Sequence, residues 1–293
     1  MHIHCYPEIS LSVRRPCEDW ETVELARDAG MRALVLKSHT WPTMSKAHHL
    51  SHEIAGIDVF GSITLNVSAG GLNPWAVEMA ARQGAKVVWM PTWSSKNDWT
   101  QGGFSDLMKG WMPSLKESGL RQPLTVLDSS GELLPEVVSI ISVAKEHELV
   151  LSTGHLSTEE ALSIGREAEK IGFTKLIFGH PLTRSVGATL IQMKEMVNRG
   201  AHVELTALSC FWPGTPNTAL QRTVEVIDQL GAEHCILTTD SFGDWPPPSP
   251  EFLRMFLGRI LILGVDENSI RVMVKENPSK LLDLSLEGHN DYL

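Results

Sequence analysis

Cysteine, long apolar runs and surplus positive charge are all scarce in this sequence of 293 residues. Four cysteines, none of them in Cys-x-x-Cys spacing, argue against a disulfide-rich scaffold and against a zinc–thiolate site. No apolar run approaches the roughly 20 residues that span a bilayer, and the first residues lack the charged and apolar regions of a signal peptide. We therefore expect a cytoplasmic protein without a membrane partner.

The charge balance argues against nucleic acid as a binding partner. Lys and Arg number 25 against 35 Asp and Glu, which gives a formal net charge of −10. Because binding to phosphate backbones needs clustered Lys and Arg, and no basic patch stands out, nucleic acid is not an expected partner. We expect a small-molecule substrate and a homo-oligomer.

Eight short β-rich apolar runs are spread along the chain, which is typical of buried parallel strands. They are residues 2–6, 33–39, 58–66, 86–92, 149–155, 175–181, 202–207 and 235–240. Amphipathic helical stretches separate them, and several end at a glycine shortly before the next strand, as at Gly30 and Gly231. This pattern predicts an α/β protein made of eight βα units.

A single domain over residues 1–293 is expected, because no linker rich in Ser, Gly or Pro divides the chain. Polar residues end several strands at once, which favours a (β/α)8 TIM barrel, allowing slight distortion, over a doubly wound sheet. Residues 93–131 form an insertion after the fourth strand; its tryptophans indicate either a lid over the substrate or a dimer contact. Extra C-terminal helices are expected at 249–263 and 266–284.

The histidines carry the strongest functional signal. His2 and His4 are two apart on the first strand, so both side chains point to the same face. His155, His180 and Asp240 end the fifth, sixth and eighth strands, and such ends meet at the catalytic face of a barrel. Imidazole and carboxylate ligands that converge there suit zinc, manganese or iron, with open positions left for water.

The order of these five residues resembles that of the amidohydrolase superfamily of metal-dependent hydrolases, over nearly the whole chain. Four stretches resemble more closely an uncharacterised family of amidohydrolase-related bacterial and archaeal proteins, which implies no substrate. These stretches are LVLKSHTWPT, LNVSAGGLNPWAV, VVWMPT and STGHLSTEE.

The resemblance implies a role for each matching residue. His2, His4 and Asp240 would ligate the more buried metal, while His155 and His180 would complete that site or hold a second ion. Asp240 would also accept a proton from the attacking water and pass it to the leaving group. The implied cofactor is one or two divalent ions, zinc in the first place and manganese or iron as alternatives.

Two positions depart from the superfamily pattern. Members usually carry Asp two residues before the first His, whereas only Met1 precedes His2 here. Dinuclear members carry a bridging carboxylated Lys or a Glu on the fourth strand, which here ends in MPT at residues 90–92. Lys37, at the end of the second strand, is the nearest substitute. We predict it as a sixth, bridging ligand and, with Asp240 and His180, as a catalytic residue; a charged substrate contact and a rim lysine in solvent are the alternatives.

Other polar residues lie at or just beyond strand ends and could orient a substrate. They are His39, Arg15, Asn66, Asn73 and Glu204. Cys5 and Cys210 lie near the barrel mouth without an evident activating base, and we expect them to be buried thiols.

The leading functional prediction is a hydrolase of amidohydrolase or lactonase type. It would use a metal-activated water to cleave an amide, cyclic amide, lactone or ester bond. The second is a decarboxylase with a single metal, which agrees with the missing ligand on strand four. The third is a non-catalytic protein whose metal site would be coordinatively closed.

Overall fold

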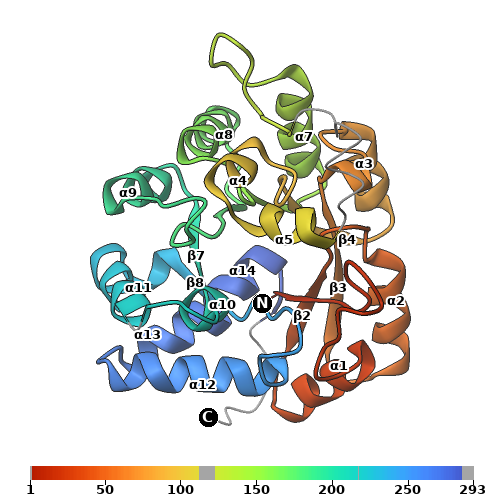
Figure 1. Cartoon of the computed structure of the whole chain (residues 1–293), viewed down its shortest axis with the longest axis vertical. Coiled ribbons are helices and arrows are strands. Elements are labelled where there is room, and N and C mark those ends of the chain that lie inside the picture. The colour runs from red at the N-terminus through yellow and green to blue at the C-terminus, as the bar shows by residue number, and fades with distance from the viewer. Residues whose placement is uncertain (1, 112–122, 217, 286–293) are drawn as a thin grey trace.

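The computed structural model describes residues 2–111, 123–216 and 218–285. Its strands form one parallel eight-stranded sheet in the order of the sequence. They are β1 (His2–His4), β2 (Ala33–Lys37), β3 (Asp58–Thr64), β4 (Ala85–Trp89), β5 (Val150–Ser152), β6 (Leu176–Phe178), β7 (His202–Thr206) and β8 (Cys235–Thr238). Helices surround them (Figure 1). The predicted (β/α)8 barrel is therefore confirmed.

Helices follow the strands and cover the outside of the sheet. In chain order they are α1 (Asp19–Asp28), α2 (Met44–Glu53), η1 (Val67–Ala69), α3 (Pro74–Arg82), α4 (Lys96–Gln101), α5 (Phe104–Trp111), α7 (Pro135–Glu146), α8 (Thr158–Ile171), α9 (Leu190–Asn198), α10 (Ala207–Phe211), α11 (Thr218–Leu230), η2 (Ala232–His234), α12 (Ser249–Ile262), α13 (Glu267–Arg271), η3 (Val272–Glu276) and α14 (Asn277–Leu282). The capping box predicted for α8 is present, since Ser157 and Glu160 satisfy each other's backbone amides. Of the helices described, none has the length and apolar composition needed to cross a membrane.

Few contacts join the first strand to the last. Ile3 forms an isolated parallel bridge with Ser241, and the His4 amide donates to the Ser241 carbonyl at 3.2 Å. The His2 amide donates to Thr238 Oγ1 at 2.9 Å. We call this junction of β1 with the end of β8 the seam. Its single backbone bridge is the slight distortion of the barrel, and the seam places His2 and His4 beside the end of β8.

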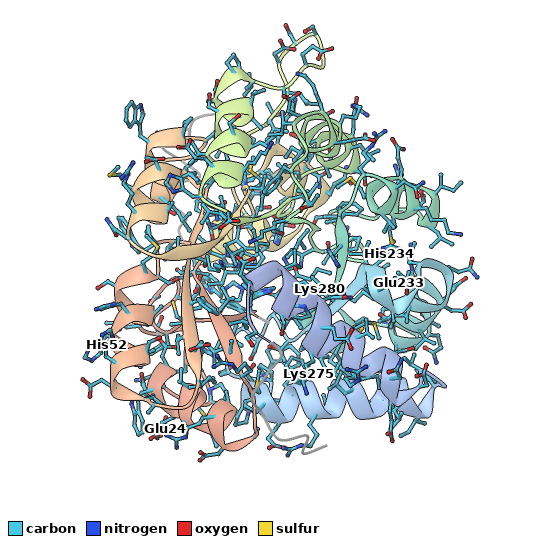
Figure 2. All side chains as sticks on the ribbon, turned by 180° about the vertical axis from the view of Figure 1, so that it is seen from behind. Glu24, His52, Glu233, His234, Lys275 and Lys280 are labelled. Atoms are coloured by element: carbon cyan, nitrogen blue, oxygen red, sulfur yellow. The ribbon has the colours of Figure 1, made fainter. Side chains whose placement is uncertain are left out.

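Apolar side chains fill the barrel interior and close one of its ends. Trp89 is completely buried at the end of β4, in a cluster that receives a side chain from most strands. Leu281 and Leu282 of α14 join this cluster, and Asn277 donates to the carbonyl of Cys235, the first residue of β8. Figure 2, seen from the side opposite to that of Figure 1, shows α14, marked by Lys280, near the centre of the molecule and facing the viewer. Among the described residues, α14 thus covers the N-terminal ends of the strands, and the interior opens at their C-terminal ends.

The predicted elements differ from the observed ones mainly at their ends. Each strand finishes one to three residues earlier than predicted, because the residues that follow turn into the loops of the barrel mouth. The helix predicted over 266–284 is observed over 267–282, where α13, the π-helical η3 and α14 follow one another without a break. Pro278 has no amide hydrogen to continue the regular α-helical pattern there. Residues 112–122 of the predicted insertion lie outside the described residues.

Candidate metal centre

A pocket of about 730 Å³ opens at the C-terminal ends of the strands. His4, His155, His180 and Asp240, from four different strand ends, all line it. Because these strands are parallel, their C-terminal ends meet at one face, as the sequence predicted. The structure thus brings together residues that are up to 236 positions apart.

Asp240 lies between the two histidines of β1. Its Oδ1 is 2.7 Å from His2 Nε2 and 3.0 Å from His4 Nε2. All three side chains are buried, and His2 lies below the pocket floor. Their ligand atoms fall within 4.8 Å of one another, close enough to share one ion.

Lys37 lies under the pocket floor and is completely buried, so the rim-lysine alternative is wrong. Its Nζ is 3.5 Å from both Asp240 Oδ1 and His180 Nε2. The same atom lies 4.7 Å from the centre of the Trp89 ring. Lys37 does not line the pocket. Its position between Asp240 and His180 therefore favours a role as a ligand over a contact with substrate.

His155 and His180 form a second histidine cluster, besides the first cluster of His2, His4 and Asp240. Their ring centres are 4.9 Å apart, with the planes nearly perpendicular. His180 Nδ1 lies 3.7 Å from Asp240 Oδ2, which links the pair to the first cluster. The ligand atoms of His2, His180 and Glu204 also lie within 4.8 Å of one another. The structure therefore offers donors for one ion or two.

In three histidines, the Nδ1 atom of the ring faces a buried carboxylate. His155 Nδ1 is hydrogen-bonded to Asp98 Oδ2 at 2.7 Å. At ion-pair distance, His2 Nδ1 lies 3.0 Å from Glu204 Oε1, and His4 Nδ1 lies 3.5 Å from Glu8 Oε2. Carboxylate partners of this kind commonly orient histidines that ligate metals. Each arrangement directs the Nε2 atom of the histidine away from its carboxylate.

Sequence reasoning missed two of these carboxylates and gave the third another role. Glu8 follows His4 by four residues in a loop, and Asp98 belongs to α4 in the insertion. The charged residue between the apolar Val203 and Leu205 of β7 was the available signal for Glu204, which lines the pocket and also faces His2. No spacing rule joins Asp98 to His155, because their contact depends on the tertiary fold.

The donor set fits a divalent cation. A neutral imidazole carries one proton, yet His2 has Glu204 at one ring nitrogen and Asp240 at the other. One carboxylate would then face a lone pair, unless the ring is protonated or a metal ion takes that place. The buried carboxylates Glu8, Asp98, Glu204 and Asp240 outnumber the single charge of Lys37. Buried charges require compensation, and a metal ion bound by His and Asp would supply it.

The protonation states of Asp240 and His180 agree with this interpretation. Burial raises the pKa of Asp240, but Lys37, His180 and His2 outweigh it and hold that pKa well below its usual value. Burial lowers the pKa of His180 to about 3, despite the opposing effect of Asp240. An ionised carboxylate and a neutral imidazole are the forms in which these side chains bind metals.

His180 and Asp240 share an uncommon backbone conformation. Their φ angles are +52° and +51°, in the left-handed region that residues other than glycine rarely adopt. Glu148 and Asp283 are the other described non-glycine residues with positive φ. Such strain is often held at functional sites, where the fold imposes it to direct a side chain.

The predicted substrate contacts fall into different places. His39 lines the pocket, with its ring centre 4.4 Å from that of Phe104, and burial lowers its pKa well below the usual value. Asn66 is completely buried below the wall, where it donates to the His39 carbonyl at 2.9 Å. Arg15 and Asn73 do not line the pocket. Arg15 bonds the His4 carbonyl and Asp19, and Asn73 caps α3 by accepting from the Trp75 amide.

The insertion covers part of the metal centre. Trp93 is buried and donates from Nε1 to the His39 carbonyl at 3.2 Å. Phe104 and Leu107 line the pocket, and Phe104 lies 5.1 Å from Phe242 between ring centres. These contacts favour a lid over a dimer contact for the described part of the insertion.

The cysteines have the buried character expected of them. Burial, with Glu8 and Asp19 nearby, raises the pKa of Cys5 to about 12. Burial also raises the pKa of Cys210, which lies 3.2 Å from Thr223 Oγ1. Neither thiol is set up as a nucleophile.

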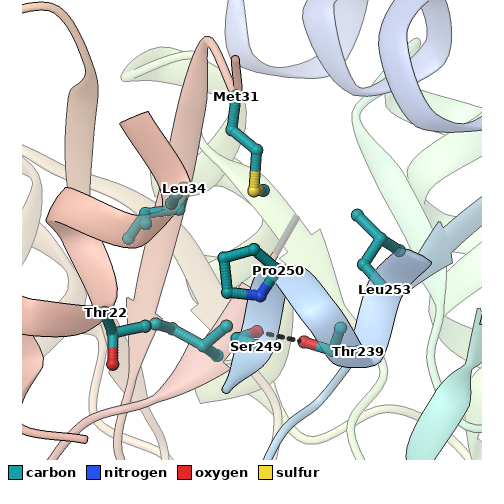
Figure 3. Close-up of a pocket in the computed structure, with 9 residues that line it drawn as sticks. Thr22, Met31, Leu34, Thr239, Ser249, Pro250 and Leu253 are labelled. Atoms are coloured by element: carbon teal, nitrogen blue, oxygen red, sulfur yellow. Dashed lines mark hydrogen bonds between the residues drawn. The ribbon is translucent and has the colours of Figure 1, made fainter. Parts of the chain in front are cut away.

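A second hollow, between α1, β2 and the start of α12, is too small for a substrate. Figure 3 shows Met31, Leu34, Pro250 and Leu253 around it, with Thr239 bonded to Ser249 at 2.9 Å. It holds about 10 Å³, which is room for at most one water molecule. This hollow is therefore not a candidate substrate site.

Known proteins resemble this chain in different ways. A family model described as "Family of unknown function (DUF6282)" matches residues 1–204, and no curated protein matches the sequence. Among solved structures, an amidohydrolase from Pseudomonas aeruginosa is 10% identical with a TM-score of 0.64, covering 96% of this chain and 94% of its own. The organophosphorus hydrolase of Deinococcus radiodurans is 13% identical, with a TM-score of 0.60 and coverages of 96% and 91%. A candidate 2-pyrone-4,6-dicarboxylic acid hydrolase from Pseudomonas putida is 13% identical, with a TM-score of 0.58 and coverages of 98% and 97%. At these identities the likeness shows the (β/α)8 fold alone.

Proposed function

The chain belongs to the DUF6282 family and has an amidohydrolase-type fold, and from this premise we propose that it is a metal-dependent hydrolase of small molecules. The bond cleaved is an amide, cyclic amide, lactone or ester. One observation carries the proposal: Asp240 lies between the imidazoles of His2 and His4, at the floor of a pocket large enough for a substrate. The solved structures of similar fold whose names describe amidohydrolase, organophosphorus and pyrone hydrolase activities support it.

The metal would be held by residues of three kinds. His2, His4 and Asp240 would ligate the inner ion, while His155 and His180 would ligate a second ion or complete the first site. Lys37, whose Nζ lies 3.5 Å from both Asp240 Oδ1 and His180 Nε2, would link these two residues as a carboxylated side chain. Zinc suits these nitrogen and oxygen donors, with manganese or iron as alternatives. Bound there, such an ion supplies Lewis acidity that activates water and polarises a carbonyl group.

Asp240 is the proposed proton carrier. Its carboxylate is ionised and faces the pocket, so it can accept a proton from the attacking water and return it to the leaving group. Neutral His180 keeps a lone pair for a ligand role at the same floor. Phe104, Leu208 and Phe242 provide apolar walls along the pocket, against which the apolar part of a substrate can pack.

Metal removal tests the proposal. The protein is first screened on lactones, cyclic amides and esters, and the best substrate is then assayed before and after treatment with EDTA. We expect hydrolysis to disappear and to return on addition of zinc or manganese, while elemental analysis gives one or two ions per chain. Full activity in rigorously metal-free protein would refute the proposal.

The same panel separates hydrolysis from decarboxylation. Hydrolysis in ¹⁸O-labelled water places the label in the product, which mass spectrometry detects. Release of CO2 without incorporation of label would instead assign a lyase. A metal that leaves no coordination position for water would favour the non-catalytic alternative.

A further inference from the structure

We propose that Asp98, in the insertion after β4, is a positioning residue that fixes the ring of His155 for a divalent cation. Through this contact, occupancy of the metal centre is coupled to the order of residues 95–105 of the insertion. The inference rests on the proposed function, because it takes His155 as a ligand. Because Asp98 belongs to a helix of the insertion, this segment would orient a metal ligand as well as cover the pocket.

The contact between Asp98 and His155 selects one tautomer of the imidazole. Asp98 Oδ2 lies 2.7 Å from His155 Nδ1, and the Asp98 side chain is completely buried. Because an ionised carboxylate only accepts hydrogen bonds, Nδ1 carries the proton. The lone pair then lies on Nε2, on the opposite side of the ring from Asp98. An imidazole fixed in this way is ready to bind a cation.

The carboxylate of Asp98 is itself held in place. Its Oδ1 accepts from the Ser105 amide at 2.6 Å, while Ser95 Oγ accepts from the Asp98 amide at 3.0 Å. Ser105 Oγ donates to the Asp98 carbonyl at 2.9 Å. A methyl group on Gly103 would overlap the carboxylate, so the chain passes close to Asp98 only because this residue is glycine. Both carboxylate oxygens are therefore engaged, which favours a positioning role over contact with substrate.

The same segment also holds the backbone of His155. Ser95 Oγ and Asn97 Nδ2 each donate to the His155 carbonyl at 3.0 Å. Asn97 Nδ2 donates in addition to the Ser185 carbonyl, in the loop after β6, at 2.8 Å. The insertion thus binds both ring and backbone of His155. A cation that restrains the ring will stabilise these contacts, since binding and local order are thermodynamically linked.

A double-mutant cycle between Asp98 and His155 tests the proposal. Zinc affinity of the full chain is measured by competition with a chromogenic chelator for the wild type, Asp98→Asn, His155→Ala and the double variant. We expect Asp98→Asn to weaken one zinc site by about 10- to 100-fold. In the His155→Ala background it should cause no further loss, because Asp98 acts through that ring. Asp106→Asn is the matched control, an exposed carboxylate of the same segment paired with Lys109.

Two results would overturn the inference. One is zinc binding by Asp98→Asn with the affinity of the wild type; the other is an equal loss of affinity whether or not His155 is present. The second result is what a merely structural role of Asp98 predicts. If Asp98→Asn fails to fold, hydrogen exchange of the wild-type protein decides: zinc should slow exchange of the Ser105 amide, and unchanged exchange would overturn the proposal.

The affinity cycle needs no substrate, so it separates this inference from the proposed function. If the zinc affinities follow the expected cycle but no substrate is hydrolysed, the proposed hydrolase function is contradicted and the role of Asp98 is not. EDTA-sensitive hydrolysis with a failed cycle contradicts only the role of Asp98.

Discussion

His2 Nε2 lies 2.7 Å from Asp240 Oδ1, across the seam where the first strand meets the end of the last. Among the described strands, the junction joined by a single backbone bridge is therefore also the place where the proposed inner metal ligands meet. A bound ion would join β1 to β8 by coordination where backbone bonds are few. Metal binding should accordingly stabilise the fold as well as supply the chemistry.

Asp240→Asn should abolish most of the hydrolysis and leave the fold intact. Asparagine adopts the left-handed backbone readily, so the loop is kept, but the amide cannot accept the proton from water. We expect kcat to fall about 10²- to 10⁴-fold, the usual contribution of general acid–base catalysis. The assay uses the best substrate of the panel, with circular dichroism to verify folding. Asp244→Asn, at an exposed position of the same loop, is the control. Undiminished turnover in Asp240→Asn would exclude this role.

Lys37→Met should destabilise the metal-free protein. The substitution leaves the buried Asp240 carboxylate without its nearest lysine, and breaking a buried ion pair costs about 3–5 kcal/mol. Urea unfolding of the EDTA-treated protein measures the loss. The exposed Lys96→Met serves as the control and should unfold like the parent. Equal stability of Lys37→Met and the parent would show that the ammonium does not compensate the cluster.

Carboxylation of Lys37 can be observed directly. Zinc-loaded protein equilibrated with ¹³C-bicarbonate should show a carbamate carbon resonance by NMR. The resonance should be absent from Lys37→Met and should disappear from the wild type on acid denaturation. A spectrum of the zinc-loaded wild type that matches Lys37→Met would leave Lys37 as an uncarboxylated cation.

Gly103→Ala should disturb the insertion, whereas Gly110→Ala should not. A methyl group at position 103 would overlap the Asp98 carboxylate, and overpacking of this kind typically costs about 1–3 kcal/mol. At position 110, in α5, a methyl group meets nothing within 4 Å. Thermal unfolding of both variants provides the comparison. Equal melting temperatures would mean that the chain near Asp98 relaxes freely.

His202 predicts how stability depends on pH at the closed end of the barrel. Burial, with the nearby charges of His234 and Lys280, lowers the pKa of His202 from 6.5 to about 4; Figure 2 marks the two neighbours. Below pH 6.5 the unfolded chain binds a proton that the folded chain rejects until about pH 4, so stability falls as the pH falls across this window. The loss reaches about 3 kcal/mol, at about 1.36 kcal/mol per unit of pKa.

Urea unfolding at a series of pH values across this window measures the effect. His202→Gln should reduce the slope of stability against pH, because glutamine does not titrate. The exposed His52→Gln is the control and should keep the wild-type slope. A slope that is the same in His202→Gln and the wild type would show that other groups cause the acid loss.

The sequence was sufficient for the strand order and for the residues at the strand ends. His155, His180 and Asp240 could be placed because parallel strands deliver their ends to one face, whatever the loops do. Glu8 and Asp98 could not, since each reaches its histidine from a loop or an inserted helix whose path depends on tertiary packing. Arg15 and Asn73 were chosen for their nearness to strand ends, but local bonds direct both away from the pocket.

The left-handed backbone conformations of His180 and Asp240 imply that stability of the fold and function favour different residues at these positions. Such a conformation costs an L-residue about 1–2 kcal/mol, and glycine would adopt it freely. A search for thermostable variants would therefore tend to enrich glycine at these two positions and discard the side chains at the pocket floor. Positions that resist this drift under selection for activity would identify the ligands even while the substrate is unidentified.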